Sequence, residues 1–363
     1  MTNPPLTIIG AGPVGLLLAC LLGKRGVSVN VYEKRSGFRR ASMAIGITPP
    51  SLDILGELDL KSAFLRQGVS IARARVFENQ KSCGILDFRG SEAEILSFPQ
   101  FGTERLLRQR LADFPSVHVH EGVEITPESL KALPGWIIAC DGAHSPIRRY
   151  LGIPMQQKEY GVRFVMADFP DLEDLGPDAR LYFSRHGAVE SFSLPGQSRR
   201  WIAQCVSGAP QDLSTLLTRV QDAAGVDLSD RSPGPICPFA PRRALARTYV
   251  KDRFIFCGDA AHVMSPIGGQ GMNTGFADAL HLSRILPEPD ADALCAYTRE
   301  RQRAFRIAAR RAALGMWLGT RSGIPASNLR RNLLRFALRE RHVHDSLVQT
   351  FAMRNLPTVS SHP

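Results

Sequence analysis

Three short glycine-containing segments each directly follow a run of apolar residues, and acidic or amide side chains lie within two of them and 23 residues after the start of the first. They are Gly10–Gly15 (G-A-G-P-V-G), Cys140–Arg148 (C-D-G-A-H-S-P-I-R) and Gly258–Asn273, while Glu33 lies 23 residues after Gly10. Glycine lets backbone amides approach a phosphate group, and a carboxylate at a strand end accepts hydrogen bonds from sugar hydroxyls. The spacing therefore predicts a nucleotide-binding site assembled from three separate parts of the chain.

The first segment lies between an apolar, strand-like run at 6–9 and a helix predicted over 16–24, with a second strand predicted over 27–33. This is a βαβ unit of the expected ~30 residues. Gly10 would make the turn, Gly12 would admit a pyrophosphate to the backbone, and Gly15 would let helix and strand pack closely. Because Glu33 is an acid, it favours ribose hydroxyls over a 2′-phosphate, so FAD or NAD is expected.

The other two segments follow strands predicted at 136–139 and 253–257. An Asp-Gly turn after a strand, as at Asp141, is common and means little alone. The third segment is more informative, because G-D-A-A-H is followed by P-I-G-G-Q-G-M-N at the start of a helix predicted over 271–286. Asp259 can accept hydrogen bonds from a sugar or ribityl chain, and the helix N-terminus can face a delocalised negative charge.

Together, and in this order, the three segments resemble those of the FAD-dependent aromatic hydroxylases, the single-component class A flavoprotein monooxygenases related to para-hydroxybenzoate hydroxylase. The resemblance extends over roughly residues 6–286. It implies non-covalent FAD, NADPH or NADH as a transient co-substrate, and O₂. The implied reaction is hydroxylation of an aromatic or similarly electron-rich small molecule by a C4a-hydroperoxyflavin.

The resemblance also assigns residues to the cofactor. The first segment and Glu33 would hold the ADP half of FAD, Asp259 the ribityl chain, and residues 269–273 the edge of the flavin ring. Arg40 and Arg105 match flavin-contacting arginines, although solvated surface arginines are an equal alternative. The cofactor set is Gly10, Gly12, Pro13, Val14, Gly15, Glu33, Lys34, Arg40, Arg105, Asp141, Asp259, Pro266, Gly269, Gly271, Met272 and Asn273.

No catalytic residue is assigned. Pro266 would line the reacting face of the flavin, and candidate substrate residues in the central strands are Arg163, Tyr182, Arg185 and His186, each of which could equally be an ordinary sheet residue. We interpret His262 as a loop histidine packed beneath the flavin rather than as a base. The histidines at 118, 120 and 144 lack the spacing of metal ligands, so no metal site is expected.

The fold class predicted from these patterns is α/β, with a Rossmann-type FAD-binding domain, an inserted and mostly antiparallel substrate sheet, and C-terminal helices. The FAD-binding domain would comprise 1–73, 99–153 and 241–290. The substrate domain would comprise 74–98 and 154–240, and the helical segment 291–363.

The composition of the chain excludes several classes of protein. The chain has 363 residues, 44% hydrophobic and 22% charged, which excludes a disordered or fibrous protein. Its seven cysteines are scattered without a C-x-x-C pair, which favours a reducing, cytoplasmic compartment over disulfides or zinc. The apolar run at 6–22 is interrupted by glycines and proline, and no run reaches the ~18 residues of a membrane span, so no transmembrane segment is expected.

The net charge is +11, and twelve arginines but only two acids lie between Arg299 and Arg341. Aromatic side chains are sparse there, so nucleic acid is not expected. An anionic partner such as NADPH or a carrier-bound substrate is one interpretation, and a solvated helix is the simpler one. Rival functions on the same fold are a flavin-dependent halogenase or reductase, whose tryptophan-containing signatures are absent here, and a non-enzymatic FAD-binding redox protein.

Overall fold

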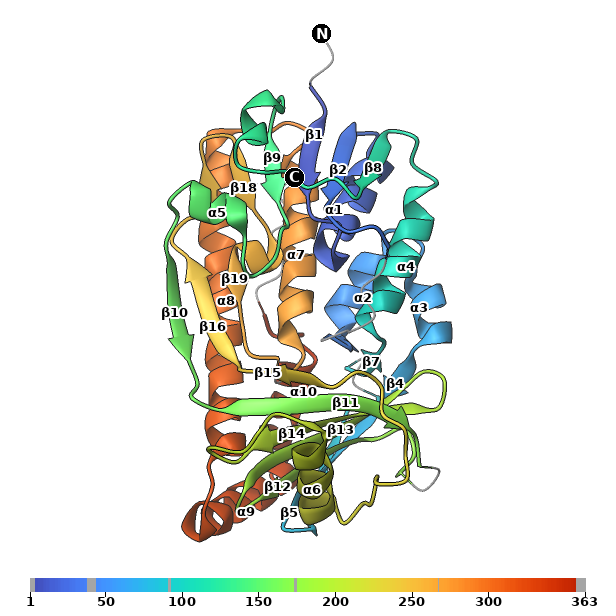
Figure 1. The fold of residues 1–363 in the computed structure, drawn as a ribbon, viewed down its shortest axis with the longest axis vertical. Helices are drawn as coiled ribbons and strands as arrows, with labels where there is room; N and C mark the ends of the chain where they lie inside the picture. Colours follow the sequence, from blue (N-terminus) through green and yellow to red (C-terminus); the bar gives the residue numbers. More distant parts are fainter. Residues whose placement is uncertain (1–3, 38–43, 91–92, 173–174, 267, 357–363) are drawn as a thin grey trace.

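The computed structural model describes residues 4–37, 44–90, 93–172, 175–266 and 268–356. Figure 1 shows two sheet-containing halves, with the N-terminal strands at the top and a second large sheet at the bottom. The long helix α8 (Ala291–Thr320) runs from one half to the other along one side of the molecule.

The first half is built on a six-stranded sheet in the order β17-β18-β9-β1-β2-β8. Its five parallel strands all point the same way, and β17 alone is antiparallel. The strands are β1 (Leu6–Ile9), β2 (Val29–Glu33), β8 (Val117–Glu121), β9 (Ile137–Ala139), β17 (Val250–Lys251) and β18 (Phe254–Phe256). Because β1, β9 and β18 are neighbours, the segments that follow them meet at one edge of the sheet.

Helix α1 (Pro13–Lys24) crosses between β1 and β2, as the sequence predicted. Its proline is at the helix start, where the missing N–H costs nothing. Residues 15–23 are all buried, since this helix is apolar around its whole circumference. Further helices on this half are α2 (Pro49–Gly56), α3 (Lys61–Gln67), α4 (Gln100–Leu111), α5 (Pro146–Tyr150) and α7 (Gln270–Ile285).

The second half contains a seven-stranded mixed sheet in the order β15-β11-β14-β13-β12-β5-β6, antiparallel except for the pair β12 and β5. Helix α6 (Leu213–Ala224) packs on one face over Tyr182, Val189 and Trp201. The strands are β5 (Arg73–Glu78), β6 (Lys81–Asp87), β11 (Arg163–Pro170), β12 (Ala179–Ser184), β13 (Gly187–Leu194), β14 (Ser198–Cys205) and β15 (Cys237–Phe239).

Two three-stranded sheets connect the halves. One joins β3 (Gly46–Ile47), β7 (Ile95–Ser97) and β4 (Val69–Ile71), and the other joins β10 (Met155–Glu159), β16 (Arg242–Ala246) and β19 (His262–Val263). Each pairs strands from both predicted domains, so the domain boundaries stay a prediction. The fold class is confirmed: a parallel Rossmann-like sheet, an inserted mostly antiparallel sheet and C-terminal helices.

The C-terminal helices are α8, α9 (Ile324–Arg339) and α10 (Arg341–Phe351). The helical pattern is interrupted between Thr320 and Ile324, and Pro325 lies in the first turn of α9. Helix α10 returns to the junction of the two halves, where Val348 and Phe351 join a cluster that includes Ile71 and Ala74.

Candidate functional site

The loop between β1 and α1 contains three glycines, and the space available for a side chain differs among them. Gly10 has a φ of +106°, and a Cβ there would overlap the carbonyl of Cys140. A Cβ at Gly15 would overlap the carbonyl of Gly10, so the helix and the loop approach as closely as the motif predicts. At Gly12, by contrast, a Cβ would meet nothing within 4 Å. The open side of this loop is therefore at Gly12, where a pyrophosphate would approach the backbone.

Glu33 is buried at the end of β2 and faces this loop. Its Oε2 accepts a hydrogen bond of 2.9 Å from the amide of Ala11, and its Oε1 accepts from the backbone and side chain of Arg35. Burial alone would raise the pKa of Glu33, but these hydrogen bonds outweigh it and hold the pKa below its usual range. The carboxylate is thus ionised and fixed. Its neighbour Lys34 is exposed and lies 3.8 Å from Glu124.

The second segment follows β9 and is held by its own side chains. Asp141 Oδ2 accepts a 2.7 Å hydrogen bond from Ser145, which also caps α5 by accepting from the amide of Arg148. The Arg148 guanidinium donates to the carbonyl of Ala260 at 2.7 Å, which ties this segment to the third one. Asp141 Oδ1 is buried without a hydrogen-bond partner, and burial raises the pKa of this carboxyl.

The third segment follows β18 and leads into α7. The Asp259 side chain is exposed to solvent on one side. The surrounding protein nevertheless raises the pKa of Asp259, and this effect outweighs the lowering by the charges of His262 and Arg242. Gly269 is left-handed, with a φ of +64°, immediately before α7 begins. Asn273 links this loop to β3, since its Nδ2 donates to Gly46 and its Oδ1 accepts from Thr48. Gln270 Oε1 is a second buried oxygen without a partner.

Val14 joins the first and third segments. A Cβ at Gly258 or at Gly275 would contact the Val14 methyl groups, so the side chain occupies the space that these two glycines leave. With Gly10 against Cys140 and Arg148 against Ala260, all three segments are in mutual contact. The structure therefore brings together residues separated by more than 250 positions in the chain.

His262, within the third segment, is fully buried. Its Nε2 is 2.6 Å from Asp278 Oδ2, and Asp278 also pairs with Arg301 and accepts from the amide of Gly258. Burial alone would raise the pKa of Asp278, but His262 and Arg301 lower it to about 2. This buried network supports the loop from below.

Other predicted residues are placed differently. Arg40 lies outside the described residues, and Pro266 is exposed at the edge of the third segment. Arg105 is exposed on α4 and donates to Gln67 on α3. The structure does not gather the four substrate candidates: Tyr182 packs under α6, Arg163 is exposed on β11, and Arg185 and His186 form the turn between β12 and β13.

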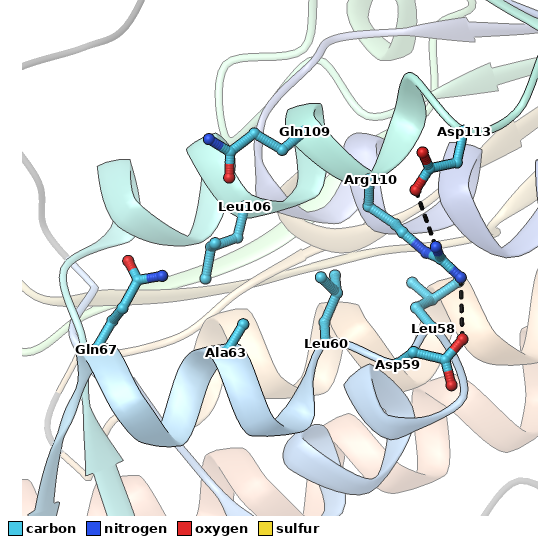
Figure 2. A pocket seen from close by; sticks show the side chains of 9 residues that line it. All are labelled: Leu58, Asp59, Leu60, Ala63, Gln67, Leu106, Gln109, Arg110 and Asp113. Carbon is cyan, nitrogen blue, oxygen red and sulfur yellow. Dashed lines mark hydrogen bonds and ion pairs between the residues drawn. The ribbon is translucent and has the colours of Figure 1, made fainter.

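A hollow of about 360 Å³ lies between α3 and α4 (Figure 2). Arg110 in its wall is 3.0 Å from Asp59 and 2.9 Å from Asp113, so its charge is already balanced. None of the residues that line this hollow belongs to the three glycine-containing segments. We therefore place the candidate site at those segments and not here.

Comparison with known proteins agrees with this geometry. A family model described as an FAD binding domain matches residues 4–312. The chain belongs to this FAD-binding family. Rifampicin monooxygenase of Streptomyces venezuelae is 27% identical over 301 residues, covering 76% of this chain and 62% of that protein. Kynurenine 3-monooxygenase of Anopheles gambiae is 26% identical over 359 residues, covering 81% and 74%.

This chain thus spans less than two thirds of the first of these FAD-binding relatives. Among solved structures, p-nitrophenol 4-monooxygenase from Pseudomonas putida DLL-E4 has a TM-score of 0.86 at 20% identity, covering 98% of this chain and 99% of that one. At this identity the likeness shows the fold alone. The family resemblance inferred from the three segments is confirmed.

The described residues fit FAD. Asp141 Oδ1 and Gln270 Oε1 are buried acceptors without partners, and the open side of Gly12 has room for a phosphate-bearing ligand. Within the described ranges, no three His, Cys, Asp or Glu side chains gather as a metal site would require. No described helix is both long and apolar enough to span a membrane.

Proposed function

We propose that this protein is an FAD-dependent monooxygenase that uses NADPH or NADH and O₂ to hydroxylate an aromatic or similarly electron-rich small molecule. The observation that carries the proposal is the convergence of the three segments around unpartnered acceptors, in a chain of the FAD-binding family. The names of its relatives support the same reaction class, since the two relatives described above are named as monooxygenases.

The chemistry supplied by bound FAD is transfer of electrons from NADPH or NADH to O₂. The residues of this chain would hold the FAD in position. The loop at Gly12 would hold the pyrophosphate, Glu33 the ribose, and Asp259 the ribityl chain. Helix α7 begins at Gln270, so its first amides present partial positive charge to the negative charge that reduced flavin carries.

The second half of the molecule would then hold the substrate and keep water away from the reacting atoms. Partners are the small-molecule substrate, O₂ and the nicotinamide. An anionic carrier that presents the substrate is a further proposed partner, supported by the arginine-rich C-terminal helices. All seven cysteines are unpaired, which together with the need for NADPH or NADH supports a cytoplasmic location.

Labelled dioxygen tests the proposal. The FAD-loaded protein is incubated with NADPH or NADH, ¹⁸O₂ and a panel of phenols, arylamines and polyketides, while nicotinamide consumption and product mass are followed. We expect one labelled oxygen atom in the product and faster nicotinamide oxidation with substrate. Label from water only, or a halogenated or saturated product, contradicts the proposal. A lack of nicotinamide oxidation under every condition favours a non-enzymatic redox role.

A further inference from the structure

The seven-stranded sheet has a second face, opposite α6, that no sequence motif singled out. Side chains alternate between the faces of a strand, and Val189 of β13 packs under α6, so Glu190 points to the opposite face. Glu190 is directly paired with Leu181 on β12 and Ile202 on β14. All three side chains are half-buried, so solvent reaches this part of the face.

Glu190 is the only polar member of a row that crosses the sheet. From Leu181 the row continues to Val76 on β5, and from Ile202 it continues to Met166 on β11. Every one of these partners is apolar. A single carboxyl in an apolar row is unexpected for a packing surface, because burying an unpaired acid is unfavourable.

This face looks toward the flavin-binding segments. Phe192, two residues along β13 from Glu190, belongs to a cluster with Ile95 of β7 and Phe351 of α10. A Cβ at Gly46 would contact both Ile95 and Gly269, the residue that precedes α7. A Cβ at Gly268 would likewise contact the ring of Phe351. In Figure 1, β7 and α10 occupy the junction between the halves.

The opposite end of the face is closed by the end of α8. Gln204 Nε2 donates to the carbonyl of Thr320 at 3.0 Å, and Phe183 lies against Gly319. The inward side of α8 near this point carries Ala312 and Met316, which do not titrate. Glu190 and its two strand partners therefore occupy an accessible stretch between two covered ends.

Two arginines at this face are already paired with carboxylates. Arg200 forms two hydrogen bonds to Asp168, at 2.7 and 2.9 Å, and Arg330 of α9 forms two to Glu78, at 2.6 and 2.8 Å. On α10, His344 Nε2 accepts from the amide of Asp87, and its ring also contacts Asp345. Burial raises the pKa of Glu190 to about 7, and no charged group offsets the shift.

We propose that Glu190 is the substrate-binding carboxyl of the active site, and that it selects aromatic substrates bearing a neutral hydrogen-bond donor, such as a phenol or arylamine, over aromatic carboxylates. This rests on the proposed function, since it places the reacting ring between this face and the flavin loop. The ionised carboxylate accepts the donor's hydrogen bond. For a phenol, transfer of that proton to Glu190 leaves the electron pair on the phenol oxygen and activates the ring.

Binding of two shape-matched probes tests the proposal without requiring turnover. Calorimetry of FAD-loaded wild type should give an affinity for 4-methylphenol that rises through pH 7, as Glu190 ionises. Glu190→Gln should bind 4-methylphenol about tenfold more weakly at pH 8, with a flat pH profile. The same variant should bind 4-methylbenzoate more tightly than wild type does, because a like charge is removed. The exposed Glu159→Gln is the matched control and should change neither affinity.

Equal affinities and pH profiles in Glu190→Gln and wild type would overturn the proposal, as would failure of wild type to bind 4-methylphenol. The two proposals fail separately. If wild type incorporates label from ¹⁸O₂ while Glu190→Gln retains full kcat/KM, the monooxygenase proposal survives and the role of Glu190 is wrong. If the opposite shifts in probe affinity appear but no product is labelled, Glu190 binds the ligand and the monooxygenase proposal is wrong.

Discussion

Gly12 and Gly15 belong to one motif, but their substitution should have different consequences. A side chain at Gly12 meets no protein atom within 4 Å, and its backbone, with φ −74° and ψ 178°, is allowed for any residue. Gly12→Val should therefore fold normally and lose FAD, because the branched side chain fills the pyrophosphate position. Gly15→Val should instead lower the melting temperature or prevent folding, because its Cβ overlaps the Gly10 carbonyl.

Flavin absorbance after gel filtration and thermal unfolding of the FAD-free protein measure the two effects. Gly56→Ala, at a helical position with space for a methyl group, is the control and should change neither. A folded Gly12→Val protein with stoichiometric FAD would show that this loop does not bind the cofactor.

The contrast between Gly12 and Glu190 shows which site residues the sequence could reveal. Glycine spacing is a local pattern, set by one turn between a strand and a helix, so it is readable without the fold. Glu190 lies in a strand whose two faces both mix apolar and polar residues, so the sequence does not say which face looks toward the flavin. The same ambiguity placed Tyr182 among the four substrate candidates, although it packs under α6. Only the register of the sheet shows that Tyr182 lies on the face covered by α6 and Glu190 on the opposite face.

At the scale of elements, Asp278 connects α7 to α8 and to the loop after β18. It is fully buried and pairs with Arg301 and His262. Asp278→Asn would leave the Arg301 charge uncompensated in the interior, which costs about 3–5 kcal/mol. We expect a large loss in the free energy of unfolding, measured with urea. Asp292→Asn, exposed in the first turn of α8, is the control. A loss under 1 kcal/mol would show that the network contributes little.

The same carboxyl predicts acid sensitivity. The pKa of Asp278 in the folded protein is about 2, below the usual 3.8 of an aspartate side chain, so its stabilising effect is present above pH ~4 and is lost as the pH falls toward 2. Between pH 5 and 2.5, the free energy of unfolding should fall more steeply with decreasing pH for wild type than for Asp278→Asn. Parallel curves for the two proteins would assign the acid sensitivity to other carboxyls.

Elements were predicted where length and periodicity coincide. Strand β1 and helix α1 were predicted from the sequence because each has a clear apolar pattern and a defined start or end. Helices α2 and α3 were missed, since with eight and seven residues they are too short for a helical period to be distinguished. Pro325 marks the start of α9, because a proline is tolerated in the first turn of a helix and cannot continue the preceding one.

Across the whole molecule, the arginine excess divides into structural and surface parts. Among the twelve arginines between Arg299 and Arg341, Arg301 and Arg330 are buried against Asp278 and Glu78. These two hold α8 and α9 in place and do not contribute to an external field. Arg335 and Arg339, by contrast, are exposed on α9. Sequence alone could not separate the two groups, because a buried arginine needs a partner that is distant in the chain.

A surface field of this kind should attract anions and be screened by salt, since the Debye length is ~10 Å at 0.1 M ionic strength. If the helices assist NADPH or an acidic carrier, reversing Arg335 and Arg339 to Glu should raise KM for that partner a few-fold at low salt and flatten its salt dependence. The value of kcat should stay nearly constant, because neither residue belongs to the three glycine-containing segments. Lys131→Glu with Lys158→Glu, two exposed lysines elsewhere, controls for net charge. The same KM change in both double variants would point to net charge alone, and no change in either would leave these arginines as a solvated helix face.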